Sequence, residues 1–439
     1  MSFFNERYRK VLRISLPAAM HNLLNIVQGL IDMFFVGSIS AVSVAAVGVS
    51  MQYMGLMYAF MSLIYVGTNT LVSRFYGARD MTKAGQTIFM MILFSFVISG
   101  PITYIAINYG PELFNLLNTG EEVAKEGTAY MKMFALGIPA MYIMGVFFSG
   151  MNAIGATKIP LFISISGNIL NVFLDWVLIF GKLGFKPMGV EGAALATVLV
   201  IYFQIVLYLY VYVVRKKIQI TIKIDLTLLK RALKVAIPTW VERISSHPSY
   251  LVLSALIAKY GVDSLAGYQI GLRLEGIAFM PGIGFTMAGM ALVGQGIGAG
   301  SPDDAERDAI ATTVSAAAVM GFIGVLMIAF AHPMASVFSD NEDAINYAAY
   351  YLRIMGFSQV PLAITFVMSG CLRGAGDTRG TFLINTASLW GLRIFPAWLI
   401  SMITDTPIWI FIVCVAETFI RSIILMRRFR SGHWKSIKV

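Results

Sequence analysis

Residues 12–37 read LRISLPAAMHNLLNIVQGLIDMFFVG, an apolar stretch interrupted by a few polar side chains. An α-helix needs about 20 predominantly apolar residues to cross a hydrocarbon core about 30 Å thick, so this stretch is long enough to span a membrane. Comparable stretches recur along the whole chain, and we count about twelve of them. They start near Leu12, Val44, Lys83, Gly127, Lys158, Val190, Lys230, Ser264, Ala305, Asp343, Gly380 and Pro407.

The composition also predicts an all-α integral membrane protein. Of the 439 residues, 58% are hydrophobic and 13% are charged, whereas soluble domains have roughly 45–50% apolar and 25% charged residues. The net charge of +10 is spread over alternate loops and is not gathered on a soluble domain, so we expect no nucleic-acid partner. The two cysteines, Cys371 and Cys414, predict neither a disulfide framework nor a metal site.

The positions of the basic residues predict the orientation. They precede the first span, lie between the second and third and between the sixth and seventh, and follow the last. In that order they are Arg7, Arg9, Lys10, Arg13; Arg74, Arg79, Lys83; Arg215, Lys216, Lys217, Lys223, Lys230, Arg231, Lys234; and Arg427, Arg428, Arg430, Lys435, Lys438. The positive-inside rule therefore places both termini in the cytoplasm of a multi-pass protein of the cell's inner (plasma) membrane. An acidic run at residues 303–308 does not fit this pattern, but acidic residues contribute little to orientation.

The chain repeats itself at an offset of about 220 residues. LRISLP at residues 12–17 aligns with LKVAIP at residues 233–238, and two further pairs follow in the same order. They are VSRFYG at 72–77 with VGQGIG at 293–298, and the segment ending GATK at 155–158 with the one ending GDTR at 376–379. Three ordered matches predict a duplication into two six-helix lobes, related by a pseudo-two-fold axis along the membrane normal. We predict an N-lobe over residues 1–214, a cytoplasmic linker over 215–229 and a C-lobe over 230–439.

Polar side chains of the first half are predicted to share one depth in the membrane. The first span carries a stripe on one helical face, spaced by four, three and four residues: His21, Asn25, Gln28 and Asp32. The fifth and sixth spans bring further oxygen-bearing groups to the level of Asp32, namely Asn171, Asp175 and Thr197. An ionised acid at the centre of a membrane helix costs roughly 2.5–3.5 kcal/mol, and no arginine or lysine of this half lies at this depth.

Two acids without a basic partner must take up protons or hold a cation. We therefore predict a cation- or proton-coupling site at Asp32, Asp175, Asn171 and Thr197. The structural alternative is a pair of protonated acids that hydrogen-bond to each other. These features, with the two lobes, indicate a secondary transporter.

The second half carries charges of both signs. Its membrane segments contain Glu242, Arg243, Arg273, Glu275, Arg393, Glu417 and Arg421. Such a set can neutralise itself as a structural ion-pair cluster. The alternative is a second coupling or substrate site at Glu242, Glu275, Arg243 and Arg393. Pro248 and Pro281 mark expected bends in the seventh and eighth spans.

Methionines cluster in the second span at helical spacing, at Met51, Met54, Met57 and Met61. This pattern is more typical of packed or lipid-facing side chains. The functional alternative is an adaptable lining for apolar ligands. As candidate lining residues of a substrate cavity we take Asn25, Gln28, Met51, Met54 and Gln269.

Several runs resemble transporters of the multidrug and toxic compound extrusion (MATE) family, of the prokaryotic type. They are NIVQGLIDMFFVG at 25–37, GNILNVFLD at 167–175, GVEGAALAT at 189–197, PTWVER at 238–243, LAGYQIGLRLE at 265–275, FMPGIGF at 279–285, ALVGQGIGAG at 291–300 and LRGAGDTR at 372–379. The resemblance covers essentially the whole chain. It implies a two-lobed antiporter that expels cationic amphipathic compounds against inward H⁺ or Na⁺. By motif position, Asp32 is the family's acid of the first span, with Asn171, Asp175 and Thr197 around it.

Other functions remain as alternatives at this stage. A flippase for a lipid-linked precursor shares the superfamily architecture, although the unpaired acids of the first half argue against it. A membrane-embedded enzyme would need catalytic motifs on the spans, and we find no metal-binding His/Glu spacing, Ser/Lys pair or paired-Asp protease motif. We therefore expect no enzymatic activity, no cofactor beyond the coupling ion, and a monomer in the lipid bilayer.

Overall fold

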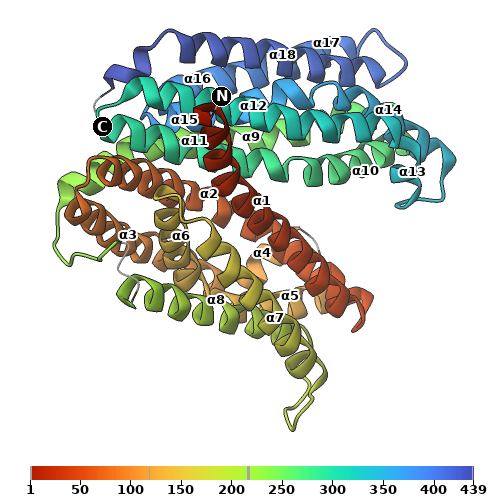
Figure 1. The fold of residues 1–439 in the computed structure, drawn as a ribbon. Helices are drawn as coiled ribbons and strands as arrows, with labels where there is room; N and C mark the ends of the chain where they lie inside the picture. The colour runs from red at the N-terminus through yellow and green to blue at the C-terminus, as the bar shows by residue number, and fades with distance from the viewer. Residues whose placement is uncertain (1, 118, 215–217, 438) are drawn as a thin grey trace. The chain divides into compact units, whose positions relative to one another are not determined.

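The computed structural model describes residues 2–117, 119–214, 218–437 and 439, and every regular element among them is a helix (Figure 1). Side chains are described for these residues except 2–5 and 56. The predicted linker residues Arg215, Lys216 and Lys217, and the basic residue Lys438 of the tail, lie outside the described residues.

The described helices include enough long apolar segments for the predicted spans. Seven are long and apolar enough to cross a membrane singly, and four bent pairs raise the number to eleven. The twelfth predicted span falls on α9 (Leu226–Ala258), a helix of 33 residues that is not among these candidates and carries Lys230, Arg231, Lys234, Glu242 and Arg243. The all-helical, two-lobed, twelve-helix prediction is thus confirmed.

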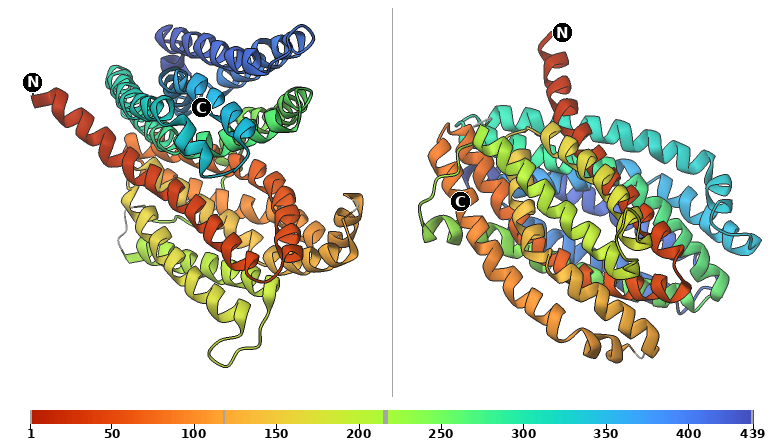
Figure 2. Two further views of the ribbon diagram at one scale, coloured as in Figure 1. Left: turned by 90° about the vertical axis from the view of Figure 1, so that its right-hand side faces the viewer. Right: turned by 90° about the horizontal axis from the view of Figure 1, so that it is seen from below.

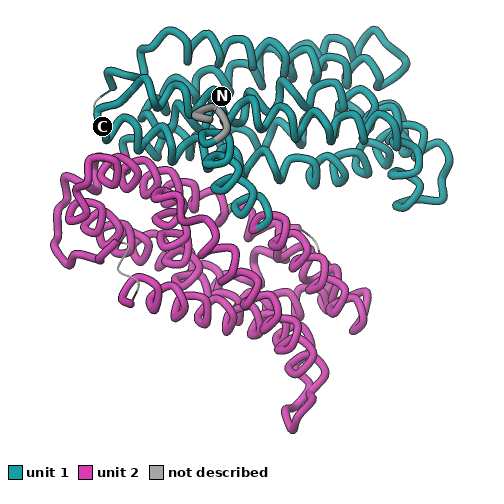
Figure 3. Tube along the Cα trace, viewed as in Figure 1, with its two compact units in different colours: residues 1–20, 234–439 teal, residues 21–233 magenta. Residues whose placement is uncertain are grey.

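Residue contacts divide the chain into two compact units (Figure 3). Unit 1 consists of Met1–Met20 with Lys234–Val439, and unit 2 consists of His21–Leu233. Two helices cross this division. The first turns of α1 (Ser2–Gly37) belong to unit 1, whereas the first turns of α9 belong to unit 2. The lobe boundaries at residues 214 and 230 stay a prediction.

Unit 2 is a bundle in which α2, α3 and α6 pack against one another and α7 packs along α8 (Figure 2). Its helices after α1 are α2 (Ala41–Gly77), α3 (Met81–Asn108), α4 (Gly110–Leu116), α5 (Glu121–Ala135), α6 (Ile138–Ala153), α7 (Lys158–Phe180) and α8 (Gly189–Val214). Asp80 starts α3 by accepting a hydrogen bond from the Lys83 N–H. Gly181 ends α7 in the left-handed region, at φ 67°, which glycine adopts without strain.

Unit 1 is a second bundle, in which α15 packs against α11, α12 and α18. Its helices are α10 (Val262–Ala278), α11 (Met280–Gly298), α12 (Pro302–Ala329), α13 (Ala331–Ser336), α14 (Glu342–Gly356), α15 (Gln359–Gly374), α16 (Thr378–Ala387), η1 (Ser388–Ile394), α17 (Phe395–Ile400), α18 (Ile408–Arg430) and η2 (His433–Ser436). The expected bend near Pro281 is present, because α10 and α11 meet at 41°. Pro248 lies inside the continuous helix α9, and the bend expected there stays a prediction.

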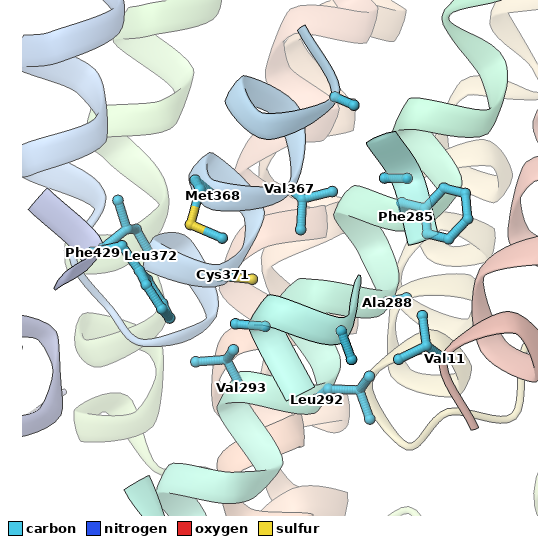
Figure 4. Close-up of a cluster of buried hydrophobic side chains, with 14 of the residues drawn as sticks. Val11, Phe285, Ala288, Leu292, Val293, Val367, Met368, Cys371, Leu372 and Phe429 are labelled. Atoms are coloured by element: carbon cyan, nitrogen blue, oxygen red, sulfur yellow. The ribbon is translucent and has the colours of Figure 1, made fainter. Parts of the chain in front are cut away.

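An apolar cluster holds the first turns of α1 in unit 1 (Figure 4). Val11 is fully buried beside Ala288 and Leu292 of α11. Gly284 permits this close approach, because a Cβ at that position would lie 2.6 Å from the Ala19 backbone nitrogen. The beginning of the chain is therefore part of the core of its second half.

Ion pairs join the same turns of α1 to the start of α12. Arg7 pairs with Asp304 at 3.0 Å, and Lys10 pairs with Asp308 at 3.0 Å. From the other end of the chain, Lys435 pairs with Asp303 at 3.0 Å and with Glu306 at 2.6 Å. The acidic run at residues 303–308 thus has a structural explanation, since it neutralises basic residues from both terminal segments.

Candidate functional site

The predicted coupling residues of unit 2 meet between α1 and α7. The buried face of α7 carries Asn171 and Asp175 one turn apart, and the polar stripe of α1 carries Gln28 and Asp32 one turn apart. The Gln28 amide donates from Nε2 to Oδ1 of Asp32 at 2.5 Å and to Oδ1 of Asn171. One amide therefore links the two helices at the level of the acids.

Asp32 and Asp175 form a carboxyl pair. Asp175 is 1% exposed, and its carboxyl lies close enough to that of Asp32 for a hydrogen bond when one of them is protonated. Among the described residues, neither oxygen of Asp175 has a hydrogen-bond donor, and neither acid has an ion pair. Two ionised carboxylates within hydrogen-bonding reach of each other repel, so the pair must share a proton or hold a cation.

Further polar groups surround this pair that sequence reasoning missed. The Asn168 amide donates to the Leu24 backbone carbonyl at 3.2 Å, which fixes α7 against α1 about two turns from the acids. Tyr58 and Tyr130 lie within electrostatic range of Asp32. Asn168 could have been found, because it begins the spacing that continues to Asn171 and Asp175. The tyrosines gave no such signal, because aromatic residues make up 13% of the chain and these two have no distinctive spacing.

Thr197 lies at the predicted depth but bonds within its own helix. Gly192 contacts Leu178 and Gly167 contacts Gln204, so α7 and α8 run antiparallel and bring Thr197 close to the level of Asp175. Its hydroxyl donates to the Ala193 carbonyl at 3.1 Å. Thr197 thus lies at about the same level along α8 as Asp175 does along α7. Among the described residues, its hydroxyl makes no hydrogen bond to Asp32 or Asp175.

The candidate cavity-lining residues have different environments. Asn25 is exposed on α1, with its amide 3.4 Å from His21 Nε2. Met54 is 6% exposed and therefore packed, whereas Met51 is 37% exposed. Gln269 is exposed on α10 of unit 1. Among the described side chains, Gln28 is the proposed lining residue that hydrogen-bonds to the carboxyl pair.

In unit 1, Glu242 is neutralised by groups that the sequence did not single out. Its Oε1 accepts from Arg373 Nη2 at 2.7 Å and from Asn385 Nδ2 at 2.9 Å. Both side chains of the ion pair are largely buried. Arg243, the neighbouring residue in the sequence, is exposed.

A second buried cluster forms around Glu417 on α18. Arg393 donates to it from Nη2 at 2.6 Å, and Arg421 Nε lies 3.1 Å from its other oxygen. Arg393 comes from η1, a π-helical turn, and such turns are frequent at functional sites. Glu275 is 2% exposed and accepts a hydrogen bond from the Tyr351 hydroxyl. Glu242 and Glu275 thus have separate partners and share no contact among the described side chains.

The two units are therefore unequal in chemistry. Unit 2 holds a carboxyl pair that has no ion pair with a described basic residue, whereas in unit 1 Glu242 and Glu417 pair with arginines. Within the described residues, no group of three or more His, Cys, Asp or Glu side chains has the arrangement to hold a metal ion.

The chain is similar in sequence and in fold to known proteins. The MatE family model matches residues 17–177 and again residues 238–399, one match in each half. The probable multidrug resistance protein NorM of Thermotoga maritima is 27% identical over 98% of this chain and 94% of its own. The multidrug resistance protein PmpM of Pseudomonas aeruginosa is 26% identical over 88% and 82%, respectively. A crystal structure of the Vibrio cholerae MATE transporter VcmN has the same fold, with a TM-score of 0.91 and 19% identity over 99% of this chain and 100% of that one.

Proposed function

Because the chain belongs to the MatE family, we propose that it is an antiporter. It would export cationic amphipathic compounds in exchange for H⁺ or Na⁺. The family is one of multi-pass membrane transporters rather than enzymes. Relatives along nearly the whole chain are called multidrug resistance proteins, which supports a drug-like substrate.

The carboxyl pair of Asp32 and Asp175 carries this proposal. A buried pair without a basic partner has high affinity for one positive charge, whether a proton or a small cation. The pair belongs to two helices, so its occupancy affects how α1 packs on α7. The coupling ion is thus a cargo that binds and leaves, and no resident cofactor is needed.

Gln28 supplies the step from ion binding to helix movement. Its amide donates to Asp32 and Asn171 at once. Protonation of Asp32, or a cation on it, competes with this amide for the carboxylate oxygen and weakens the link between α1 and α7. Alternating access follows if the two arrangements of α1 open the substrate path to opposite sides of the membrane.

We further propose that the chain lies in the plasma membrane as a monomer, with both termini in the cytoplasm. The basic residues at alternate helix ends support this orientation. The amphipathic substrate would then enter from the cytoplasm or the inner leaflet and leave outward.

Dye efflux from proteoliposomes tests the proposal. We expect an imposed H⁺ or Na⁺ gradient to drive efflux in the parent protein. Asp32→Asn should lose coupled export while remaining inserted and folded, because the amide can neither take up a proton nor hold the cation. Glu112→Gln, a change of an exposed acid on α4, is the matched control and should transport normally. Full export by Asp32→Asn would refute the assigned site, and a parent protein that responds to neither gradient would refute antiport.

A further inference from the structure

A cavity of about 500 Å³ lies at one end of unit 1, where α16 begins and α18 ends. None of the charged groups of the two glutamate clusters lines it. Its wall combines apolar side chains with cations: Leu383, Ile384 and Ile437 with Lys234, Arg379 and Arg428. An amphipathic wall of this kind suits a ligand with a charged group and an apolar portion.

The cations of this cavity outnumber its acidic side chains. Asp377 pairs with Arg428, accepting from Nε at 2.8 Å and from Nη2 at 3.2 Å. Asp377 also caps α16 by accepting a hydrogen bond from the Gly380 N–H at 3.3 Å. Its carboxylate therefore already occupies the N-terminus of α16, where an anion could otherwise bind. Lys234 and Arg379 are exposed, and among the described residues neither has an ion pair. Two cations thus remain available to a ligand.

The position of the cavity indicates the source of that ligand. It lies at the ends of the spans Thr378–Ile400 and Ile408–Arg430, next to the basic end of α18. That is the level of the lipid headgroups, on the side that the basic residues place in the cytoplasm, where anionic lipids attract lysine and arginine.

The internal repeat gives independent support. Lys234 aligns with Arg13, and Arg379 aligns with Lys158, so both halves keep a basic residue at each position. Among the described residues, neither Lys234 nor Arg379 has an ion pair that would explain this charge structurally.

We propose that this cavity binds the phosphate group of an anionic phospholipid, with Lys234 and Arg379 on the phosphate and the apolar wall against the start of the acyl chains. The proposal does not depend on the transport function. It concerns a lipid bound at the edge of the protein rather than a transported substrate.

Native mass spectrometry of the detergent-purified full chain, titrated with phosphatidylglycerol, tests this proposal. Lys234→Gln/Arg379→Gln should bind the lipid roughly tenfold more weakly than the parent protein, because two cations at a headgroup are removed. Lys230→Gln/Arg427→Gln is the matched control, since it removes two exposed cations near the same helix ends but outside the cavity. The charge-retaining Lys234→Arg/Arg379→Lys should bind as the parent does, and it keeps the test valid if the neutral variant misfolds.

Two further arms identify the ligand. Phosphatidylcholine should bind weakly to all variants, and inorganic phosphate alone should not compete with phosphatidylglycerol. Competition by inorganic phosphate would support the phosphate site but assign it to a soluble anion. Equal binding of phosphatidylglycerol by the parent, the neutral variant and the control would overturn the proposal.

Discussion

Gln28 is the residue that joins α1 to α7 in the carboxyl-pair site. Sequence spacing could predict that Gln28 and Asp32 share a helix face, and that Asn171 and Asp175 do the same. It could not predict which groups bond across the helices, because this depends on the rotation of α1 against α7. The structure shows that a single amide reaches both Asp32 and Asn171.

Gln28→Leu removes this donor with little change in volume. We expect transport at a fixed ion gradient to fall about tenfold, because a hydrogen bond to a charged group contributes roughly 1.5–3 kcal/mol. Dye efflux from proteoliposomes measures the rate. Gln219→Leu, the same change at an exposed glutamine outside the helices, should transport close to the parent rate. Equal rates for both variants and the parent would show that Gln28 plays no part in coupling.

Glu417 is the centre of a buried charge cluster in unit 1, and we predict a structural role for it. It is fully buried between Arg393 and Arg421. Removing one partner of a buried ion pair typically costs about 3–5 kcal/mol, since it leaves an uncompensated charge. Glu417→Leu should therefore lower the thermal unfolding temperature in detergent markedly. Arg393→Met/Glu417→Leu should recover part of the loss, and a single variant that unfolds like the parent would contradict this role.

At the scale of elements, the positions of the spans were predictable and their internal geometry was not. Hydropathy reports where a segment can cross a membrane, so most span starts were predicted to within about four residues. The first and fourth were not, because α1 begins at Ser2 rather than near Leu12 and α5 begins at Glu121 rather than near Gly127. It says nothing about the π-helical turn η1, which directs Arg393 toward Glu417. It also could not pair Glu242 with Arg373, because the two residues are 131 positions apart and several arginines could have served.

Glycines set the separation of packed helices, as in α11 and α15. A Cβ on Gly370 would lie 2.5 Å from the Thr286 carbonyl oxygen, so the helices can only approach this closely without it. Gly370→Ala should destabilise the protein by about 1–3 kcal/mol through overpacking. Gly276→Ala is the control, because a Cβ there meets no described atom within 4 Å. Thermal unfolding in detergent should separate the two, and a neutral Gly370→Ala would refute the tight packing.

At the scale of the whole molecule, the duplication could be predicted and the contact units could not. Three ordered motif pairs were enough to find two related halves, and the family model matches each half once. The sequence could not show that each half's first helix begins in the other unit, because hydropathy does not record which helices contact one another.

The proposed orientation can be checked with single cysteines. Cys371 and Cys414 are both buried, so the parent chain should give little background with a membrane-impermeant maleimide. Lys182→Cys, in the loop between α7 and α8, should react in intact cells, because that loop is predicted to be outside. Ser436→Cys should react only after the cells are permeabilised. The reverse pattern would place the termini outside and refute the proposed topology.

The exchanged start of α1 has a consequence for how the chain is made. The ribosome produces Arg7 and Val11 first, yet their partners on α11 and α12 come from the second half. Lys435, near the other end of the sequence, forms ion pairs with Asp303 and Glu306 in the same acidic turn of α12. A chain whose synthesis stops early therefore leaves Val11 uncovered and Arg7 without its acid. The full set of ion pairs on this acidic turn can therefore form only after the segment that contains Lys435 has been synthesised.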